Sequence, residues 1–337
     1  MHFSELAIKF PKVSIVIPAR NEEKNLPVLL KSIAEQKLNF VEVIVANDSS
    51  TDDTKKIAQE MGAIVVDVPL LESGWTGKTW ALQNGAKAAT GEILFFVDAD
   101  TFFENHALQR ILSIFLTGKK TSAISIIPFH KMNRMYENFS LFFNILMCLG
   151  TDSFLFKSKK HQKARLVGQS LVIAKDTFYK VGAYEKVKGL VLENFFLSEH
   201  LQAQGVHCTS ILGKGLLSFR MYAEGLQQLF KGWKKAFSKG TKGVSQSTML
   251  LSVLWLFGCV FVMLALLLSI PFSFDLWPSL LAYLILALNL FWMSRKIGNY
   301  SFAFSLFYPI PLAFYFFVFF SSIFKWGASA EWKGRQV

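Results

Sequence analysis

The chain has 337 residues, a formal net charge of +12 and 52% hydrophobic residues, with Phe alone occupying 34 positions. This length accommodates one large domain plus an accessory region. The three cysteines have no paired spacing, which argues against a disulfide framework or a zinc site, and no nucleic-acid-binding motif is visible. The positive charge therefore points to an anionic membrane surface rather than to DNA or RNA.

The first hundred residues alternate between strand and helix patterns. Continuous apolar strands separated by helices are typical of a parallel sheet that is covered on both faces. Such sheets bind ligands outside the carboxyl ends of their strands, and the polar clusters PARNEE, NDSSTDD and DAD fall at those ends. The predicted strands are 13–19, 41–48, 63–68 and 92–100, and the predicted helices are 21–36, 50–62 and 76–90.

This periodicity weakens after residue 120. A further strand is predicted for 123–129. Segment 137–156 is apolar but is interrupted by polar residues and glycine, so an interfacial or buried helix is favoured over a membrane span. The charge run 157–165 fits either a solvated loop or a patch that touches anionic lipid headgroups.

Segment 226–237 has a basic amphipathic pattern. Its apolar residues fall on one helical face with lysines around it, which is typical of a helix lying in a membrane interface. A surface helix packed on the protein core is the alternative. The apolar residues are Leu226, Leu229, Phe230, Trp233 and Phe237, and the lysines are Lys231, Lys234 and Lys235.

Three apolar runs follow, at 248–270, 276–293 and 301–324, and each approaches or exceeds the roughly 20 residues that a spanning helix needs. Arg295 and Lys296 lie in the second linker, so the positive-inside rule makes that linker cytoplasmic. The first linker, PFSFD, has no positive charge and is expected to be external. The sequence PIP inside the third run could break it into a re-entrant element, and a cytoplasmic tail is favoured.

No apolar segment of signal-peptide length stands at the N-terminus. We therefore expect a multi-pass protein of the plasma membrane with its first domain in the cytoplasm. The expected segments are a catalytic domain at 1–225, an interfacial helix at 226–245, a membrane region at 246–324 and a basic tail at 325–337.

Asp98 and Asp100 end the strand predicted at 92–100. In an extended chain they would point to the same side, about 6–7 Å apart, and repel each other by roughly 3 kcal/mol. A divalent cation, Mg²⁺ or Mn²⁺, would offset this repulsion and share its coordination shell with substrate phosphates. The alternative is that the two acids cap a helix in the following TFFENHALQR.

Three further polar clusters fall on the same predicted sheet edge. Asp48 follows the second strand, and Arg20 and Glu22 follow the first. GWTGKTWA places Lys78 at the start of a helix, which is a reasonable phosphate site, although the complete P-loop pattern is absent. Together with DAD, these clusters indicate an enzyme that binds a phosphorylated ligand.

These motifs resemble the family 2 glycosyltransferases, which have a GT-A fold. The resemblance covers nearly all of the soluble domain. GWTGKTWA, the RMY…GWKK region and the EWKGR tail resemble the branch that contains bacterial carotenoid-acid glycosyltransferases. The matching segments begin with SIVIPARNEEKNLPVLLKSI, EVIVANDSSTDDT and GKTWALQNGAKAATGEILFFVDADT, and continue with GQSLVIAKDTFYKVGAY and VLENFFLSEHLQAQG.

The resemblance implies a nucleotide-sugar donor, usually UDP-linked, and inversion of the anomeric centre by direct displacement. It also implies a metal, Mg²⁺ or Mn²⁺, that bridges the diphosphate of the donor and acts as a Lewis acid. By this resemblance, Asp48 would hold the uracil or ribose, and Lys78 would lie near the donor. Asp98 would face the ribose and sugar and bind the metal, and Asp100 would also bind the metal. The residues that would line the nucleoside are Pro18, Ala19, Arg20 and Glu22.

Two departures from the family pattern bear on the mechanism. Asn47 stands where the family usually has a first acid, and the family's Glu-Asp base motif reads Glu193-Asn194. Either Glu193 is the base, or no strong base is needed because the acceptor is already a carboxylate or phosphate. The alternative is a shifted alignment in which Glu199 or another acid serves as the base. Gln169 and Asn194 are expected on the acceptor side.

The Gln-x-x-Arg-Trp motif of processive synthases is incomplete here, because Gln228 and Trp233 occur without an Arg-Trp pair. This favours single sugar transfer. Trp233 and Lys235 either line the acceptor entrance or anchor the helix in the interface.

The resulting hypothesis is a membrane-bound, metal-dependent enzyme that transfers a sugar, glucose in the first instance, from a UDP-sugar to a lipid-like acceptor, first of all a carotenoid acid. The alternative acceptors are polyprenyl phosphate and a diacylglycerol, sphingoid or hopanoid hydroxyl. A nucleotidyltransferase is disfavoured because PARNEE supplies no glycine-rich basic signature, and a non-enzymatic scaffold leaves the aligned polar clusters unexplained.

Overall fold

The computed structural model describes residues 10–118, 122–151, 165–190, 193–240, 246–272, 275–323, 331–332 and 335–336. The chain divides into two compact units that interleave along the sequence. The first unit comprises 1–128, 163–219 and 329–337, and the second comprises 129–162 and 220–328. The segment boundaries at 225, 245 and 324 stay predictions.

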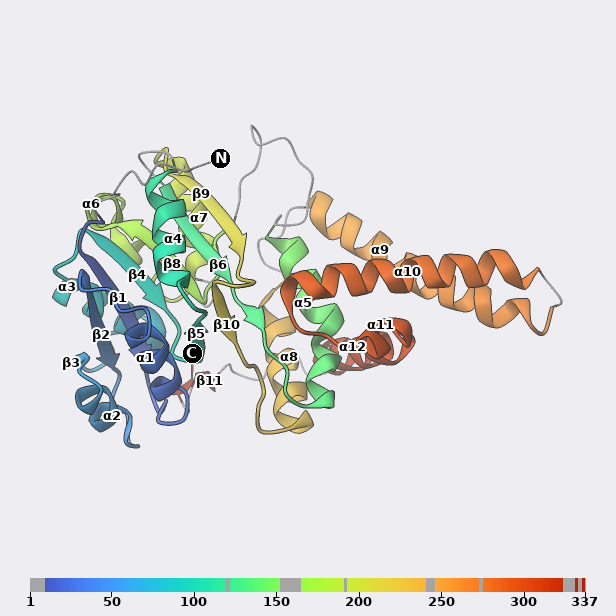
Figure 1. The fold of residues 1–337 in the computed structure, drawn as a ribbon, viewed down its shortest axis with the longest axis horizontal. Helices are drawn as coiled ribbons and strands as arrows, with labels where there is room; N and C mark the ends of the chain where they lie inside the picture. Colours follow the sequence, from blue (N-terminus) through green and yellow to red (C-terminus); the bar gives the residue numbers. More distant parts are fainter. Residues whose placement is uncertain are drawn as a thin grey trace. The chain divides into compact units, whose positions relative to one another are not determined.

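A seven-stranded, mostly parallel sheet forms the centre of the first unit (Figure 1), as predicted. Only β8 runs antiparallel to its two neighbours, β4 and β6, while the other neighbouring strands are parallel. In spatial order the strands are β3 (Ile64–Asp67), β2 (Val41–Asn47), β1 (Val13–Ala19), β4 (Ile93–Val97), β8 (Ser170–Ala174), β6 (Ser122–Ile127) and β9 (His207–Leu212).

Helices cover both faces of this sheet, which confirms the predicted architecture. Alternate residues of β1 face opposite ways, so Ile15 and Ile17 pack in one apolar cluster and Val16 packs in the other. The first cluster includes α1 (Leu26–Ala34), α2 (Thr54–Glu60) and α4 (Ala107–Leu116), and the second includes α3 (Gly77–Ala88), α6 (Lys175–Lys180), η2 (Ala183–Val187) and α7 (Glu193–Ala203).

The register of the parallel strands brings their carboxyl ends to one edge. Ala19 lies opposite Asn47, and Asn47 lies opposite Asp67, so β1, β2 and β3 end level with one another. β4 joins on the other side of β1, with Phe96 opposite Val16. The polar residues that follow these strands are therefore neighbours in space, as expected for a binding edge.

The strand predicted for 92–100 is wrong at its end, because β4 stops at Val97 and residues 98–100 turn. Thr101 closes the turn: its backbone N–H and its hydroxyl both donate to the carbonyl oxygen of Asp98, at 3.2 and 2.8 Å. The alternative of a helix cap is also wrong. Residues 101–103 form β5 (Thr101–Phe103), which pairs with β10 (Leu217–Phe219), and α4 begins only at Ala107.

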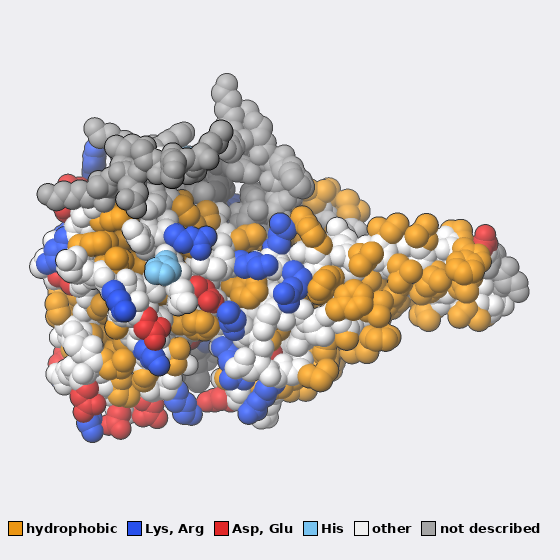
Figure 2. Space-filling model, viewed as in Figure 1, with side chains coloured by type: hydrophobic (Ala, Val, Ile, Leu, Met, Phe, Trp, Pro, Cys, Tyr) orange, Lys and Arg blue, Asp and Glu red, His pale blue; other side chains and the backbone are white. Residues whose placement is uncertain are grey.

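Two helices of the second unit are long and apolar enough to cross a membrane. They are α9 (Gln246–Ser269) and α10 (Leu276–Ile297), with mean hydropathies of 2.7 and 1.7 over their most apolar windows. They lie side by side and antiparallel (Figure 1), and most side chains on the visible face of the pair are apolar (Figure 2). Exposed apolar surface of this extent requires a lipid or protein environment.

The third apolar run is broken, as its PIP sequence indicated. α11 (Phe302–Leu306) ends before Pro309, where α12 (Pro309–Ile323) begins. Proline has no backbone N–H to continue the preceding helix. With 15 residues, α12 is shorter than the roughly 20 residues of a spanning helix. In the tail, β11 (Glu331–Trp332) pairs with β12 (Arg335–Gln336).

The helix α8 (Leu226–Gly240) packs part of its apolar face inside the second unit, because Leu229 and Trp233 are buried while Leu226 is exposed. Trp233 is buried, stacks on Phe143 with ring centroids 4.6 Å apart, and donates from Nε1 to the Ser140 hydroxyl. Phe230 contacts Phe317 of α12. This packing fits the alternative of a surface helix on the protein core, and a place in the membrane interface stays a prediction.

The remaining described elements of this unit are β7 (Phe129–His130), η1 (Met135–Ser140) and α5 (Leu141–Gly150). Most residues of α5 are buried, which agrees with the interfacial or buried helix that was favoured for this segment over a membrane span. Residues 152–164, which include nearly all of the predicted charge run, lie outside the described residues.

Candidate active site

The loops after β1 and β2 are held together by hydrogen bonds at the carboxyl edge. Asp48 is fully buried, and its backbone N–H donates to the carbonyl of Ala19 at 2.8 Å. Arg20 Nη1 donates to the carbonyl of Asp48 at 2.7 Å and lies 3.8 Å from Asp48 Oδ2. The backbone N–H of Glu22 donates to the hydroxyl of Thr54. The structure thus gathers the residues predicted to contact the nucleoside, including Pro18 in β1.

Asn47 has a structural task at the end of β2. Its amide Nδ2 donates to Asp67 Oδ1 at 2.9 Å, and Lys55 pairs with Asp67 Oδ2 at 2.6 Å. Lys55 and Asn47 together lower the pKa of Asp67. An acid at position 47 would set two carboxylates against each other, so the asparagine amide suits this neighbour better.

A lysine forms ion pairs with two acidic side chains at the carboxyl edge of the sheet. Lys78 is the second residue of α3, and its Nζ lies 2.8 Å from Asp98 Oδ1 and 3.0 Å from Glu193 Oε1. It also donates to Asp98 Oδ2 and to the carbonyl of Gly168, both at 2.9 Å. The side chains of Lys78, Asp98 and Glu193 are 19%, 24% and 5% exposed. This arrangement is hereafter the Lys78 cluster.

The charges in the Lys78 cluster depend on one another. Burial raises the pKa of Glu193, and the negative charge of Asp98 adds to this, while Lys78 opposes it; the net direction is upward. Burial alone would lower the pKa of Lys78, but Asp98 and Glu193 raise it well above its usual value. Lys78 is therefore charged at neutral pH, and Glu193 is a more basic carboxylate than an exposed one.

Asp100 lies two residues beyond Asp98 in the same turn and is exposed. Among the described residues, no group of three or more His, Cys, Asp and Glu side chains is arranged to hold a metal. Two carboxylates in one turn are hard oxygen donors that suit Mg²⁺ or Mn²⁺. They fit a cation that takes its other ligands from a bound diphosphate and water, rather than one held by protein alone.

Asn194 is buried and directs its amide at the backbone. Its Nδ2 donates to the carbonyl of Val167 at 2.9 Å and lies 3.4 Å from that of Gly168, while its Oδ1 accepts from the hydroxyl of Tyr184. These bonds anchor the start of α7 to the segment before β8. Gln169 follows this segment, and its carbonyl accepts from the backbone N–H of Asp98 at 3.1 Å. Both residues thus support the Lys78 cluster, and their contact with an acceptor stays a prediction.

Replacing Asn194 by aspartate is expected to destabilise the protein by about 3 kcal/mol, because a buried carboxylate would face two carbonyl oxygens without a donor to offer them. Urea unfolding of the full chain in detergent measures this loss, with exposed Asn39→Asp as the matched control. Unchanged stability together with faster sugar transfer would instead mean that position 194 supplies the base.

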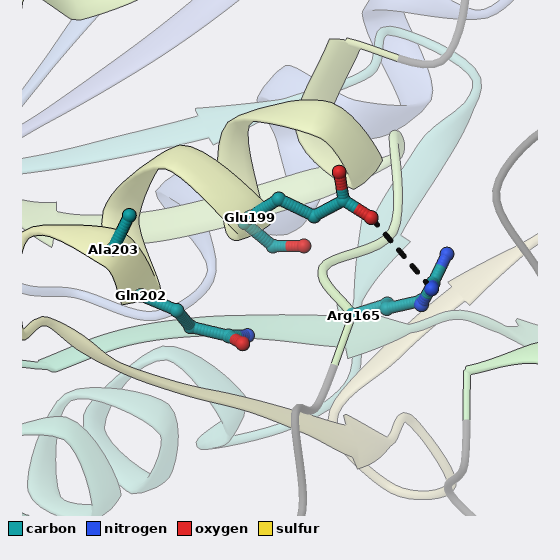
Figure 3. A pocket seen from close by; sticks show the side chains of 5 residues that line it. Arg165, Glu199, Gln202 and Ala203 are labelled. Atoms are coloured by element: carbon teal, nitrogen blue, oxygen red, sulfur yellow. Dashed lines mark ion pairs between the residues drawn. The ribbon is translucent and has the colours of Figure 1, made fainter. Parts of the chain in front are cut away.

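Glu199, the alternative base, lies on another face of α7. It stands six positions after Glu193, which places the two side chains about 120° apart around the helix axis. Its side chain is 55% exposed, and its Oε1 lies 3.6 Å from Arg165 Nη2. Figure 3 shows this pair beside Gln202 and Ala203, which line the same pocket. Glu193, and not Glu199, is the residue of α7 that pairs with Lys78.

Trp233 and Lys235, the other acceptor-side candidates, belong to the second unit. Trp233 is buried and Lys235 is exposed. Their relation to an acceptor stays a prediction.

The bridge from Lys78 to Glu193 was not predicted. Lys78 was predicted to lie near the donor and Glu193 to serve as the base, but no local pattern pairs residues so distant in the chain. Gly168 also gave no signal: a Cβ there would lie 3.5 Å from Glu193 Oε1 and 3.8 Å from Lys78 Nζ, so this glycine borders the cluster closely.

The fold and its acidic edge are those expected of a glycosyltransferase. A sequence model for glycosyl transferase family 2 matches residues 14–187, and the chain belongs to this family. It is 33% identical over 330 residues to 4,4'-diaponeurosporenoate glycosyltransferase of Staphylococcus aureus strain USA300, a match that covers 96% of this chain and 88% of that protein. The resemblance stated from the motifs is thereby confirmed.

A mannosyltransferase from Pyrobaculum calidifontis, solved in complex with GDP-Man and Mn²⁺, has a similar fold. The two structures superpose with a TM-score of 0.50 at 18% identity, over 68% of this chain and 62% of that one. This likeness agrees with the GT-A fold that the motifs predicted.

Proposed function

We propose that this protein is a membrane-bound inverting glycosyltransferase that moves glucose from UDP-glucose to the carboxylate of a carotenoid acid. The Lys78 cluster carries the proposal, because it brings together the acid expected to serve as base, Glu193, and the acid expected beside the donor, Asp98. The acceptor class is supported by the near full-length likeness to an enzyme named for 4,4'-diaponeurosporenoate.

In the proposed reaction an acceptor oxygen attacks the anomeric carbon, and the bond from that carbon to the diphosphate oxygen breaks. The diphosphate leaves with the bonding electron pair, and the configuration inverts. A carboxylate acceptor is already ionised at neutral pH and brings no proton to remove. A hydroxyl acceptor would give its proton to Glu193, whose raised pKa suits a general base.

The nucleoside would lie along the loops that follow β1 and β2. Asp48 would accept from a ring N–H or from ribose hydroxyls, and Arg20 keeps the backbone of Asp48 in place. Lys78 would offset the charge of the diphosphate. The backbone of Asp98 is fixed through its N–H and carbonyl, and Lys78 holds its carboxylate.

Asp98 and Asp100 would hold Mg²⁺ or Mn²⁺. The cation would supply charge stabilisation for the leaving diphosphate. The exposed position of Asp100 and the small number of protein ligands support a metal that enters with the nucleotide. The Mn²⁺ bound by the Pyrobaculum enzyme is consistent with this assignment.

The apolar helices α9 and α10 would anchor the enzyme in the plasma membrane. Arg295 and Lys296 stand at one end of this pair and Asp275 stands at the other. The positive-inside rule then places the basic end in the cytoplasm, where the catalytic domain is also expected. A lipid-like acceptor would reach the enzyme from the membrane.

Lipid extracts of cells with and without the protein test the proposal. We expect mass spectrometry to find a hexosyl ester of a supplied carotenoid acid only in cells that express the chain, and radioactive UDP-glucose to label the same product in isolated membranes. Label in polyprenyl-phosphate sugar or in a glycosylated diacylglycerol, sphingoid or hopanoid would contradict the acceptor and favour one of the alternatives.

A further inference from the structure

Four oxygen atoms surround the Lys78 ammonium within the Lys78 cluster. It donates to Asp98 Oδ2 and to the carbonyl of Gly168, and it forms ion pairs with Asp98 Oδ1 and Glu193 Oε1, all within 3.0 Å. An ammonium has only three N–H donors. Lys78 can therefore bind a donor diphosphate only if the phosphate displaces some of these four oxygens.

Asp98 is the fixed partner of this contact and Lys78 is the mobile one. The backbone of Asp98 is held on both sides, since its N–H donates to the carbonyl of Gln169 and its carbonyl accepts two bonds from Thr101. The lysine head stands on a flexible four-carbon stem at the start of α3. Movement of the Lys78 head thus breaks no hydrogen bond between two backbone groups, although it releases the carbonyl of Gly168.

A divalent cation on Asp98 competes with Lys78. Both carboxylate oxygens of Asp98 contact Nζ, so a cation bound there would lie close to a positive charge in a largely shielded place, where like charges repel strongly. Moving the lysine away without a new acceptor would leave its charge uncompensated. A diphosphate offers such acceptors, and this makes nucleotide and metal binding mutually dependent.

We propose that Lys78 is a counter-ion that exchanges between Asp98 and the donor diphosphate and so couples metal binding to nucleotide binding. This rests on the proposed function. Without nucleotide, Lys78 neutralises Asp98 and Glu193 and keeps the metal off. With nucleotide, Lys78 turns to the phosphates, and Asp98 becomes available to the cation.

Calorimetric titration of the full chain in detergent with Mn²⁺ and with UDP tests the exchange without any sugar transfer. In the native protein, UDP is expected to tighten Mn²⁺ binding by roughly tenfold or more, and Mn²⁺ must tighten UDP binding by the same factor. In Lys78→Gln, we expect Mn²⁺ without UDP to bind about tenfold more tightly than in the native protein, and UDP without Mn²⁺ to bind more weakly.

These opposite signs separate exchange from damage to the fold, which would weaken both ligands. Lys78→Arg keeps the positive charge and should keep Mn²⁺ binding weak in the absence of UDP. Lys87→Gln, an exposed position of the same helix, should change neither affinity.

Two results would overturn the inference. If UDP binds to the native protein but Lys78→Gln weakens or leaves unchanged the binding of Mn²⁺ alone, the exchange is wrong while the donor site stands. If the native protein binds no UDP with Mn²⁺ present, the proposed donor site fails and the exchange fails with it.

Discussion

Replacing Asp100 by asparagine is expected to lower kcat/KM for sugar transfer by a factor on the order of 10²–10³. The variant loses one of the two carboxylates proposed to hold the metal. A metal that offsets the charge of the leaving diphosphate lowers the activation free energy by several kcal/mol. The exposed position of Asp100 means that the loss should leave the fold intact. Initial rates with UDP-glucose at several Mn²⁺ concentrations measure the effect.

The form of the loss distinguishes a metal ligand from a residue that only shapes the turn. A ligand variant should recover part of its rate at high Mn²⁺, whereas a distorted turn should not respond to the metal. Asp176→Asn, which removes an exposed acid from α6 in the same unit, is the matched control and should keep the native rate. Native activity in Asp100→Asn would refute the metal site.

The sheet and its binding edge were predictable because their signals are local. Each parallel strand is a short apolar run, and polar residues begin where the run ends, as at Asp48 and Arg20. The two-faced helical cover follows from the same pattern. Likewise, the length and composition of α9 and α10 were visible directly, and Pro309 marked the break in the third run.

The features that the sequence did not predict depend on single side chains and on contacts between residues distant in the chain. The end of β4 was missed because the Thr101 hydroxyl closes the turn at Asp98, a bond that apolar periodicity does not report. The pairing of Lys78 with Glu193 requires α3 and α7 to meet at the sheet edge. Asn194 fits its position through its bond to the carbonyl of Val167, which only the folded chain supplies.

Glu193 connects the site to the choice of acceptor, and a pair of substrates that differ in one group can isolate its role. A carotenoid acid and the corresponding alcohol share the same polyene, but only the alcohol must lose a proton. With the alcohol, Glu193→Gln is expected to reduce kcat by a factor on the order of 10²–10⁴, the usual contribution of a general base. With the acid, the loss should stay below about tenfold, because the attacking oxygen already carries its charge.

The ratio between the two substrates carries the test. Glutamine also removes the charge that faces Lys78, but any effect of this on donor binding is common to both acceptors and cancels in the ratio. Glu185→Gln, at an exposed position of η2, should leave both rates unchanged. Equal losses with acid and alcohol would mean that Glu193 acts through Lys78 and the donor rather than as a base.

The pH dependence gives the same comparison without a mutation. A base works only when ionised, and the pKa of Glu193 is raised by its burial and by Asp98. Transfer to the alcohol should therefore fall off on the acid side at a higher pH than an ordinary glutamate would give. Transfer to the acid should lack this limb, because its rate needs no proton acceptor. If both substrates show the same acid limb, transfer to the carboxylate also needs a base. The idea that an ionised acceptor makes a second acid at position 194 unnecessary would then be wrong.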